Sequence, residues 1–221
     1  MTNETKQNKK EITRQKNYQL ILDAAEGLFA RMGYDGASMS LIAKEAGLPK
    51  ANVHYYFQHK ENLYKTVLDR IISQWNLGLE NINPEDDPAS VLHLYIKDKV
   101  SLAIAHPMQS RLFATEIIRG APYLKDYIRE DVRPWFNSKI EVIQSWIDQG
   151  KIKEIDPIHL LFSIWSTTQY YADFQTQVFL IMDLQEYGEQ DVDKITQTVS
   201  QLILGSLGLT VPADLGVSQS P

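Results

Sequence analysis

The sequence contains no cysteine among its 221 residues, and this absence excludes several kinds of chemistry. Disulfide bonds, thiol catalysis and cysteine-ligated metal sites all require the missing side chain. A chain without cysteine suits a reducing compartment. We therefore expect a cytoplasmic protein without disulfide bonds.

Long apolar runs are also lacking. No stretch of about 18 apolar residues occurs, so we expect neither a transmembrane helix nor a membrane partner. The first residues, MTNETKQNKKEITRQK, are polar and lack the apolar middle part of a signal peptide. The hydrophobic fraction of 43% and the charged fraction of 23% are ordinary for a globular protein.

The short motifs of common enzymes are absent as well. There is no H-E-x-x-H, no G-x-S-x-G, no P-loop and no dinucleotide-binding fingerprint. The histidines are scattered, and no spacing among them and the carboxylates suggests a metal site. We therefore predict a protein that is not an enzyme, with no metal and no cofactor. The histidines are His54, His59, His93, His106 and His159.

Charge is unevenly distributed along the chain. Residues 1–75 carry 11 Lys/Arg and 8 Asp/Glu, whereas residues 76–221 carry 11 Lys/Arg and 20 Asp/Glu. A basic first third on an acidic remainder indicates that only the first third meets a polyanion. Five basic residues in the first 16 can add contacts to DNA or simply form a solvated tail. These are Lys6, Lys9, Lys10, Arg14 and Lys16.

Helical periodicity runs through the sequence, and no strand alternation is convincing, so we predict an all-α fold. The segment 18–32 has apolar residues at helical spacing, and Gly33 is a suitable C-terminal stop. Ser38 is placed to cap a second helix that ends at Gly47. Pro49 suits the first turn of a short third helix, and Lys60 begins a longer fourth one.

Two short helices joined by a glycine-containing turn, after a longer support helix, are typical of a helix-turn-helix. The stretch IAKEAGLPKANVHYYF (42–57) has this form. On its third helix, Val53, Tyr56 and Phe57 share one face and are expected to point inward. The opposite face is short and polar, as major-groove recognition requires. It carries Lys50, Ala51, Asn52, His54 and Tyr55.

Residues 88–208 are divided by turns into about five helices. Residues 158–183 are apolar on nearly every side, and 192–203 have the three-and-four spacing of a two-helix seam. Both segments can be the centre of a monomer core, but we predict a helix-pair homodimer interface. Its candidate residues are Ile164, Thr168, Tyr171, Val192, Ile195, Val199 and Leu202.

The first third resembles the N-terminal domain of TetR-family transcriptional regulators. The matching marks are A-x-x-L-F at 25–29, G-Y at 33–34, I-A-x-x-A-G at 42–47 and Y-F-x-x-K-x-x-L-Y at 56–64. The resemblance implies about nine helices, three in a DNA-binding head and about six in a dimeric, effector-binding body. The expected divisions are a flexible basic tail (1–17), the head (18–62), the body (63–209) and an irregular tail (210–221).

The resemblance also implies roles in binding double-stranded operator DNA. Ser38 caps the second helix and reaches a phosphate, Lys50, Ala51 and Asn52 begin the recognition helix, and His54 and Tyr55 follow on its exposed side. Lys60 contacts phosphate at the start of the next helix. The family often has tyrosine where this chain has His54, which leaves that contact open because imidazole is shorter and titratable.

The body resembles a narrower, pyrimidine-sensing group of the family through SRLFATEIIRGAP (110–122) and SIWSTTQYYADFQTQV (163–178). This implies a repressor released by uracil or thymine, with Trp75, Trp165 and Gln169 at the small-molecule effector and Phe113 as an apolar lining residue. An aromatic wall suits a planar pyrimidine, and an amide suits its carbonyl and N–H edge.

Alternatives to this reading remain open. The tryptophans can be ordinary core residues, and the effector can be a different small molecule. A helical ligand-binding protein without DNA function is a third possibility. Glu116 and Arg119, three residues apart on one helix, are interpreted as a surface pair.

Overall fold

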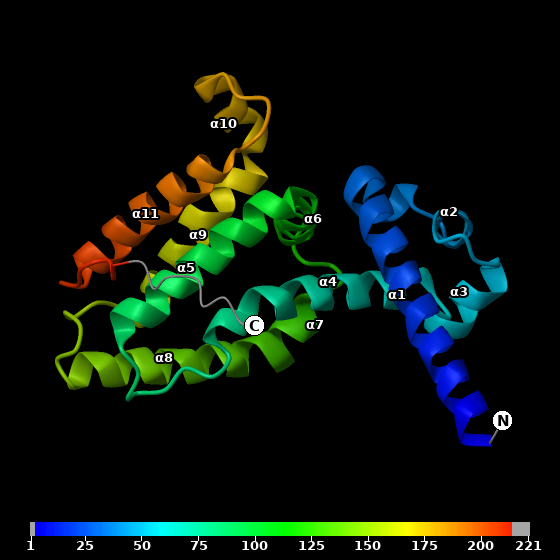
Figure 1. Cartoon of the computed structure of the whole chain (residues 1–221), viewed down its shortest axis with the longest axis horizontal. Coiled ribbons are helices and arrows are strands. Elements are labelled where there is room, and N and C mark those ends of the chain that lie inside the picture. Colours follow the sequence, from blue (N-terminus) through cyan, green and yellow to red (C-terminus); the bar gives the residue numbers. More distant parts are fainter. Residues whose placement is uncertain (1–2, 214–221) are drawn as a thin grey trace. The chain divides into compact units, whose positions relative to one another are not determined.

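The computed structural model describes the backbone of residues 3–213 and the side chains of residues 8–213, and within that part it is all-α, as predicted (Figure 1). The helices are α1 (Asn3–Gly36), α2 (Met39–Glu45), α3 (Lys50–Phe57), α4 (Lys60–Asn76), α5 (Pro88–Ala105), α6 (Pro107–Ile118), α7 (Lys125–Tyr127), α8 (Arg133–Asp148), α9 (Pro157–Asp173), α10 (Gln175–Met182) and α11 (Glu189–Ser206). A 3-10 turn η1 (Leu77–Leu79) follows α4, and a π-helical turn η2 (Ile128–Val132) precedes α8.

The described helices exceed the expected number of about nine because α7 and α10 are short additions. Residues 210–213 are irregular, as predicted, and the rest of the predicted C-terminal tail lies outside the described residues. None of the helices in residues 3–213 is both long enough and apolar enough to cross a membrane.

Helix α1 is much longer than its sequence pattern indicates. It begins at Asn3, so the tail predicted to be flexible over 1–17 is helical from Asn3 onward. Lysine, glutamine and glutamate are good helix formers, which allows the polar extension to continue the amphipathic helix. The Tyr56 hydroxyl donates a hydrogen bond to the Arg14 carbonyl (3.2 Å) and ties the extension to α3. Gly33, with φ of 70°, interrupts the helix where the stop is predicted.

The chain divides into two compact units. The head unit comprises the residues up to Ile72 together with Arg111–Leu124, and the body unit comprises Ser73–Ser110 and the residues from Lys125 onward. The head is therefore larger than the predicted 18–62, because most of α4 and the last two thirds of α6 belong to it.

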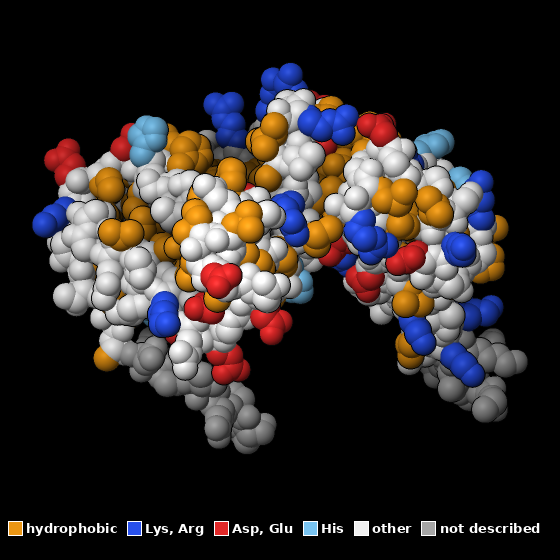
Figure 2. Space-filling view, turned by 90° about the horizontal axis from the view of Figure 1, so that it is seen from above, with side chains coloured by type: hydrophobic (Ala, Val, Ile, Leu, Met, Phe, Trp, Pro, Cys, Tyr) orange, Lys and Arg blue, Asp and Glu red, His pale blue; other side chains and the backbone are white. Residues whose placement is uncertain are grey.

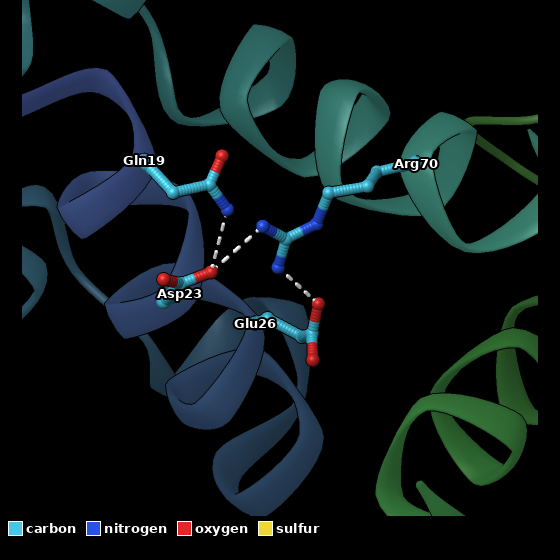
Figure 3. A network of polar contacts seen from close by, with 4 residues as sticks. All are labelled: Gln19, Asp23, Glu26 and Arg70. Atoms are coloured by element: carbon cyan, nitrogen blue, oxygen red, sulfur yellow. Dashed lines mark hydrogen bonds and ion pairs between the residues drawn. The ribbon is translucent and has the colours of Figure 1, made fainter. Parts of the chain in front are cut away.

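Ion pairs explain why α4 belongs to the head as far as Ile72. The guanidinium of Arg70 donates to Asp23 (2.7 Å) and to Glu26, and the Gln19 amide donates to the same Asp23 oxygen (2.9 Å), as Figure 3 shows. Burial alone lowers the pKa of Arg70, but the bonds to Asp23 and Glu26 outweigh it, so the pKa is raised. One side chain of α4 thus joins two turns of α1.

The body core is built from α5, α9 and α11, which pack on one another (Figure 1). Asp87 caps α5 by accepting from the Ser90 amide (3.0 Å), and Asp156 caps α9 by accepting from the Ile158 amide (2.8 Å). Both caps are followed by proline in the first turn, which fixes where each helix begins. The buried residues of this layer include Leu92, Ile96, Val100, Leu160, Leu161, Ile164, Ile195, Val199, Ile203 and Leu204.

This core corrects part of the predicted dimer interface. Ile164, Thr168, Ile195 and Val199 are buried within a single chain, so their side chains cannot form a surface for a second copy. Their helical spacing reflects packing inside the monomer, the alternative that the sequence left open. Leu202 remains on the surface with 65% of its area exposed, and Tyr171 and Val192 are partly buried.

Apolar side chains are also exposed at the end of α10. Figure 2 looks onto this end of the body and shows apolar side chains at its surface. A helix that exposes consecutive large apolar residues is a surface suited to burial in an assembly. The residues concerned are Leu180, Ile181 and Met182.

Candidate nucleic-acid interface and effector cluster

Helix α3 divides its aromatic cluster between two faces. Val53 and Phe57 are buried, and Tyr56 is partly buried, as their spacing predicts. The Phe57 ring stacks on Tyr18 of α1 with a centroid distance of 5.1 Å. These contacts fix the rotation of α3 about its axis and thereby determine which side chains point outward.

The outward face carries the residues predicted to bind DNA. Lys50, Ala51, His54 and Tyr55 are exposed, and Asn52 is partly buried. Tyr55 exposes 70% of its surface, whereas a tyrosine that only packs within the protein is usually more buried. The face therefore presents an amide, an ammonium group, an imidazole and a phenol side by side, all of which suit base edges or phosphate oxygens.

His54 has a structural partner in its own helix. Its Nδ1 lies 3.1 Å from the Gln58 carbonyl oxygen. A carbonyl oxygen has no proton to give, so Nδ1 carries the hydrogen and donates it. Gln58 closes the helix at a positive φ of 53°, and the imidazole satisfies its carbonyl there. In the neutral form, Nε2 is left as a hydrogen-bond acceptor.

Ser38 and Lys60 hold the turn that precedes α2. The Ser38 hydroxyl accepts from the Leu41 amide (3.2 Å), which confirms the predicted cap. The Lys60 ammonium donates to the carbonyls of Tyr34 (2.9 Å) and Ala37 (3.0 Å) and lies 4.2 Å from the Tyr34 ring centroid. Two of its three N–H groups are therefore used, and one remains for a phosphate.

A buried carboxylate in the head was not predicted. Glu116 is only 1% exposed and accepts from the Tyr64 hydroxyl (3.2 Å) and the Tyr123 amide (2.7 Å). Burial, followed by the charge of Glu116, raises the pKa of the Tyr64 phenol. The surface pair with Arg119 is therefore wrong, since Arg119 pairs with Asp35 (3.4 Å). Glu116 instead ties the end of α6 and the loop after it to α4.

In the body unit, Trp75 lies beneath a buried lysine. The Lys99 ammonium is 4.5 Å from a Trp75 ring centroid, and Lys99 is only 5% exposed. Burial lowers the pKa of Lys99 to about 7, although the carboxylate of Asp173 acts in the opposite direction. Asp173 in turn accepts a hydrogen bond from the buried Ser110 hydroxyl (2.6 Å).

Trp165 contacts the same side of α5 as the one that carries Lys99. Its indole N–H donates to the hydroxyl of Tyr95 (2.7 Å), which lies one helical turn before Lys99. On α9, Trp165, Gln169 and Asp173 are spaced by four and share a face. The structure therefore gathers Trp75, Trp165, Tyr95, Lys99, Ser110 and Asp173 around one side of α5. Together with Gln169, which shares their face of α9 by its spacing, we call this set the effector cluster.

The members of the cluster differ in what they can still bind. The Gln169 side chain is partly exposed and makes no hydrogen bond within the described residues, so its amide can serve a ligand. The Trp75 face is already occupied by an ammonium group. Phe113, the fourth predicted effector residue, belongs to the head unit.

Sequence reasoning missed Lys99, although a pattern pointing to it exists. Lys99 falls among Leu92, Ile96, Val100 and Ala103, on the buried side of α5. A lysine on a core-facing stripe needs a partner or a function. Among residues 8–213, no group of three histidine, aspartate or glutamate side chains is placed to hold a metal ion.

Comparison with known proteins identifies two family matches and a similar regulator. Residues 21–67 match the family described as "Bacterial regulatory proteins, tetR family", and residues 68–210 match "YcdC-like protein, C-terminal region". The HTH-type transcriptional regulator RutR of Escherichia coli K12 is 35% identical over 184 residues, which cover 83% of this chain and 87% of RutR.

Solved structures of regulators share the fold. The transcriptional regulator FadR from Bacillus subtilis, solved with stearoyl-CoA, has a TM-score of 0.63 at 22% identity, covering 86% of this chain and 98% of that one. AibR, solved with isovaleryl coenzyme A and operator DNA, has a TM-score of 0.63 at 18% identity, covering 84% of this chain and 97% of that one.

Three findings therefore agree: a helix-turn-helix with an exposed polar recognition face, two family matches that together span residues 21–210, and a relative with more than a third of its aligned residues identical. The chain belongs to the TetR family of bacterial transcriptional regulators.

Proposed function

We propose that the protein is a dimeric repressor that binds a roughly palindromic operator and is released by a small planar effector. The observation that carries this proposal is the outward face of α3, whose polar side chains are held in place by buried Val53 and Phe57. An effector that binds one body geometry better than another shifts the spacing of two DNA-binding heads. The direct test is a band-shift assay on the DNA upstream of the protein's own gene.

The α1 extension supports additional contacts to DNA. Lys9, Lys10, Arg14 and Lys16 are exposed on a helix rather than on an irregular tail, so their spacing is fixed. Lys6 lies outside the described side chains. The extension is tied to the recognition helix through Tyr56, and we propose that it adds charge contacts to the phosphate backbone next to the operator.

The effector cluster supports a planar, hydrogen-bonding ligand, and we propose a pyrimidine such as uracil or thymine. Trp165 offers an aromatic wall, and the Gln169 amide can both donate to and accept from a ring edge. A ligand ring that stacks on Trp75 must displace the Lys99 ammonium group or share the indole face with it, because that group already lies over the indole. An alternative effector of another class would use the same aromatic residues.

Uracil is expected to raise the melting temperature of the wild-type protein, and Gln169→Ala should largely abolish that rise. Removing the amide loses one or two ligand hydrogen bonds of about 1 kcal/mol each, which weakens binding roughly five- to thirtyfold. Thermal-shift titration with uracil, thymine and uric acid measures the effect.

Gln177→Ala is the matched control, since Gln177 bonds to Tyr170 and lies outside the effector cluster. If neither pyrimidine stabilises the protein at millimolar concentration while another class of compound does, the pyrimidine assignment fails and the family assignment stands.

A dimer is expected to use the surface near Leu202, and Leu202→Glu should weaken it at least tenfold. A leucine with 65% of its surface exposed gains by being covered, whereas a carboxylate at the same place must be desolvated without a partner. Light scattering coupled to size-exclusion chromatography, run over a dilution series, measures the dissociation.

Leu77→Glu provides a control with nearly the same exposure, 68%, at a site outside α9 and α11. Equal dissociation of the Leu77 and Leu202 variants, or a wild-type protein that is monomeric at micromolar concentration, would contradict the proposed interface.

A further inference from the structure

A cavity of about 420 Å³ lies in the body unit between α5 and α11. Its lining differs in chemistry from the effector cluster, because it contains no phenylalanine, tyrosine, tryptophan or aliphatic side chain. Such a cavity does not suit a flat apolar ring, and it suits a small polar molecule. It is lined by His93, Lys97, Asp193, Lys194, Thr196, Gln197 and Thr198.

One buried hydroxyl in this lining lacks a partner. Thr196 is 6% exposed, and its Oγ1 makes no hydrogen bond. Next to it, His93 Nδ1 and the Ser200 hydroxyl lie 2.9 Å apart and bond to each other. A buried hydroxyl without a partner destabilises the folded state. The Thr196 Oγ1 is closed to solvent, so a ligand oxygen accepts its hydrogen, and removes that penalty, only if the side chain turns toward the cavity.

The charged groups of the lining favour an anion. Neither Lys97 nor Lys194 forms an ion pair with any side chain in residues 8–213, and Asp193 is the single carboxylate that lines the cavity. With His93 neutral, the lining has an excess of one positive charge. The two lysine ammonium groups and the Thr196 hydroxyl are all hydrogen-bond donors, which suit the oxygens of one small anion.

We propose that the cavity between α5 and α11 binds a small carboxylate or phosphate anion, at a site separate from the effector cluster. Lys97 and Lys194 bind the charge, and Thr196 donates to one of its oxygens. Asp193 limits the charge that the site accepts, because it repels a ligand with several negative charges. The site shares α5 with Tyr95 and Lys99, so an occupied cavity stiffens the helix that carries part of the effector cluster.

The test uses the full chain and two probes, inorganic phosphate and acetate, titrated separately at constant ionic strength against sodium chloride. We expect at least one probe to raise the melting temperature in a saturable manner. The double variant K97Q/K194Q should bind that probe at least tenfold more weakly. The matched control K125Q/K153Q removes two exposed lysines elsewhere and should bind it like the wild type.

Thr196→Val separates a binding role from a structural one. Valine has nearly the same shape and removes the unpartnered hydroxyl, so the melting temperature without anion should stay the same or rise, while the anion binds several-fold more weakly. A response to phosphate alone, to acetate alone or to both supports the site and identifies its ligand class. No saturable response to either probe, or unchanged binding in K97Q/K194Q, overturns the proposal.

Discussion

Replacing Lys50 and Asn52 together with alanine is expected to abolish most sequence-specific DNA binding. Each side chain is placed on the outward face of α3, where lysine can bond guanine and asparagine can bond adenine. A good base contact contributes about 1–3 kcal/mol of discrimination, so losing two should weaken operator binding by roughly thirtyfold or more. Fluorescence anisotropy with the operator and with a scrambled duplex measures the loss.

The salt dependence of binding shows what Lys50 contacts. If Lys50 bonds a base, the single variant Lys50→Ala loses affinity for the operator much more than for scrambled DNA. If it bonds a phosphate, both duplexes are affected alike, and the slope of log affinity against log salt falls by about one.

The control for the alanine pair is Asn137→Ala with Lys153→Ala, which removes the same two residue types from exposed positions of the body unit. Wild-type protein that binds no upstream fragment even at low salt would contradict the repressor proposal. That outcome would favour the alternative of a helical ligand-binding protein without DNA function.

The sequence is sufficient to predict the recognition helix, because the pattern of that helix is local. Val53 and Phe57 lie four residues apart, and a single turn of helix determines that they face the same way. The Ser38 cap is equally local, since it involves only the three residues that follow it. Family resemblance then identifies which local pattern is a DNA-binding one.

Contacts between distant segments could not be predicted in this way. Glu116 bonds Tyr64 across 52 residues, and Asp173 bonds Ser110 across 63. The sequence contains each partner but not the topology that brings them together. Glu116 therefore resembles an ordinary surface glutamate, whereas the fold buries it against α4.

The dimer interface illustrates a different limit. Ile195 and Val199 have the spacing of a packing face, but the spacing does not say what packs against it. The same apolar stripe can be covered by the chain's own α5 and α9 or by a second copy. The structure shows that α5 and α9 of the same chain cover this stripe. The proposed interface therefore moves to residues such as Leu202 that the monomer leaves exposed.

Lys99→Met is expected to stabilise the protein at pH 7, by on the order of 1–4 kcal/mol in the free energy of unfolding. The ammonium group of Lys99 is almost completely buried, and the loss of hydration lowers its pKa from 10.5 to about 7. Methionine has a similar length, keeps contact with the Trp75 ring and has no charge to bury. Urea unfolding of the full chain measures the difference.

The pH dependence of this difference tests its cause. Between pH 7 and 10.5 the unfolded chain binds more protons at Lys99 than the folded one, so the stability of the wild type rises with pH in that window. The cost of the buried charge is fully present below pH 7 and disappears as the pH approaches 10.5. The advantage of Lys99→Met over the wild type should therefore shrink steadily between pH 7 and 9.5.

Lys139→Met is the contrasting control. Lys139 is also buried, but its ammonium donates to the Glu80 carbonyl (2.7 Å), so its removal leaves an acceptor unpaired and should lower stability. If Lys99→Met is instead destabilising by more than about 1 kcal/mol at pH 7, the attraction of the ammonium group to Trp75 and Asp173 exceeds its desolvation cost. In that case Lys99 is a structural cation that an effector on Trp75 could not readily displace.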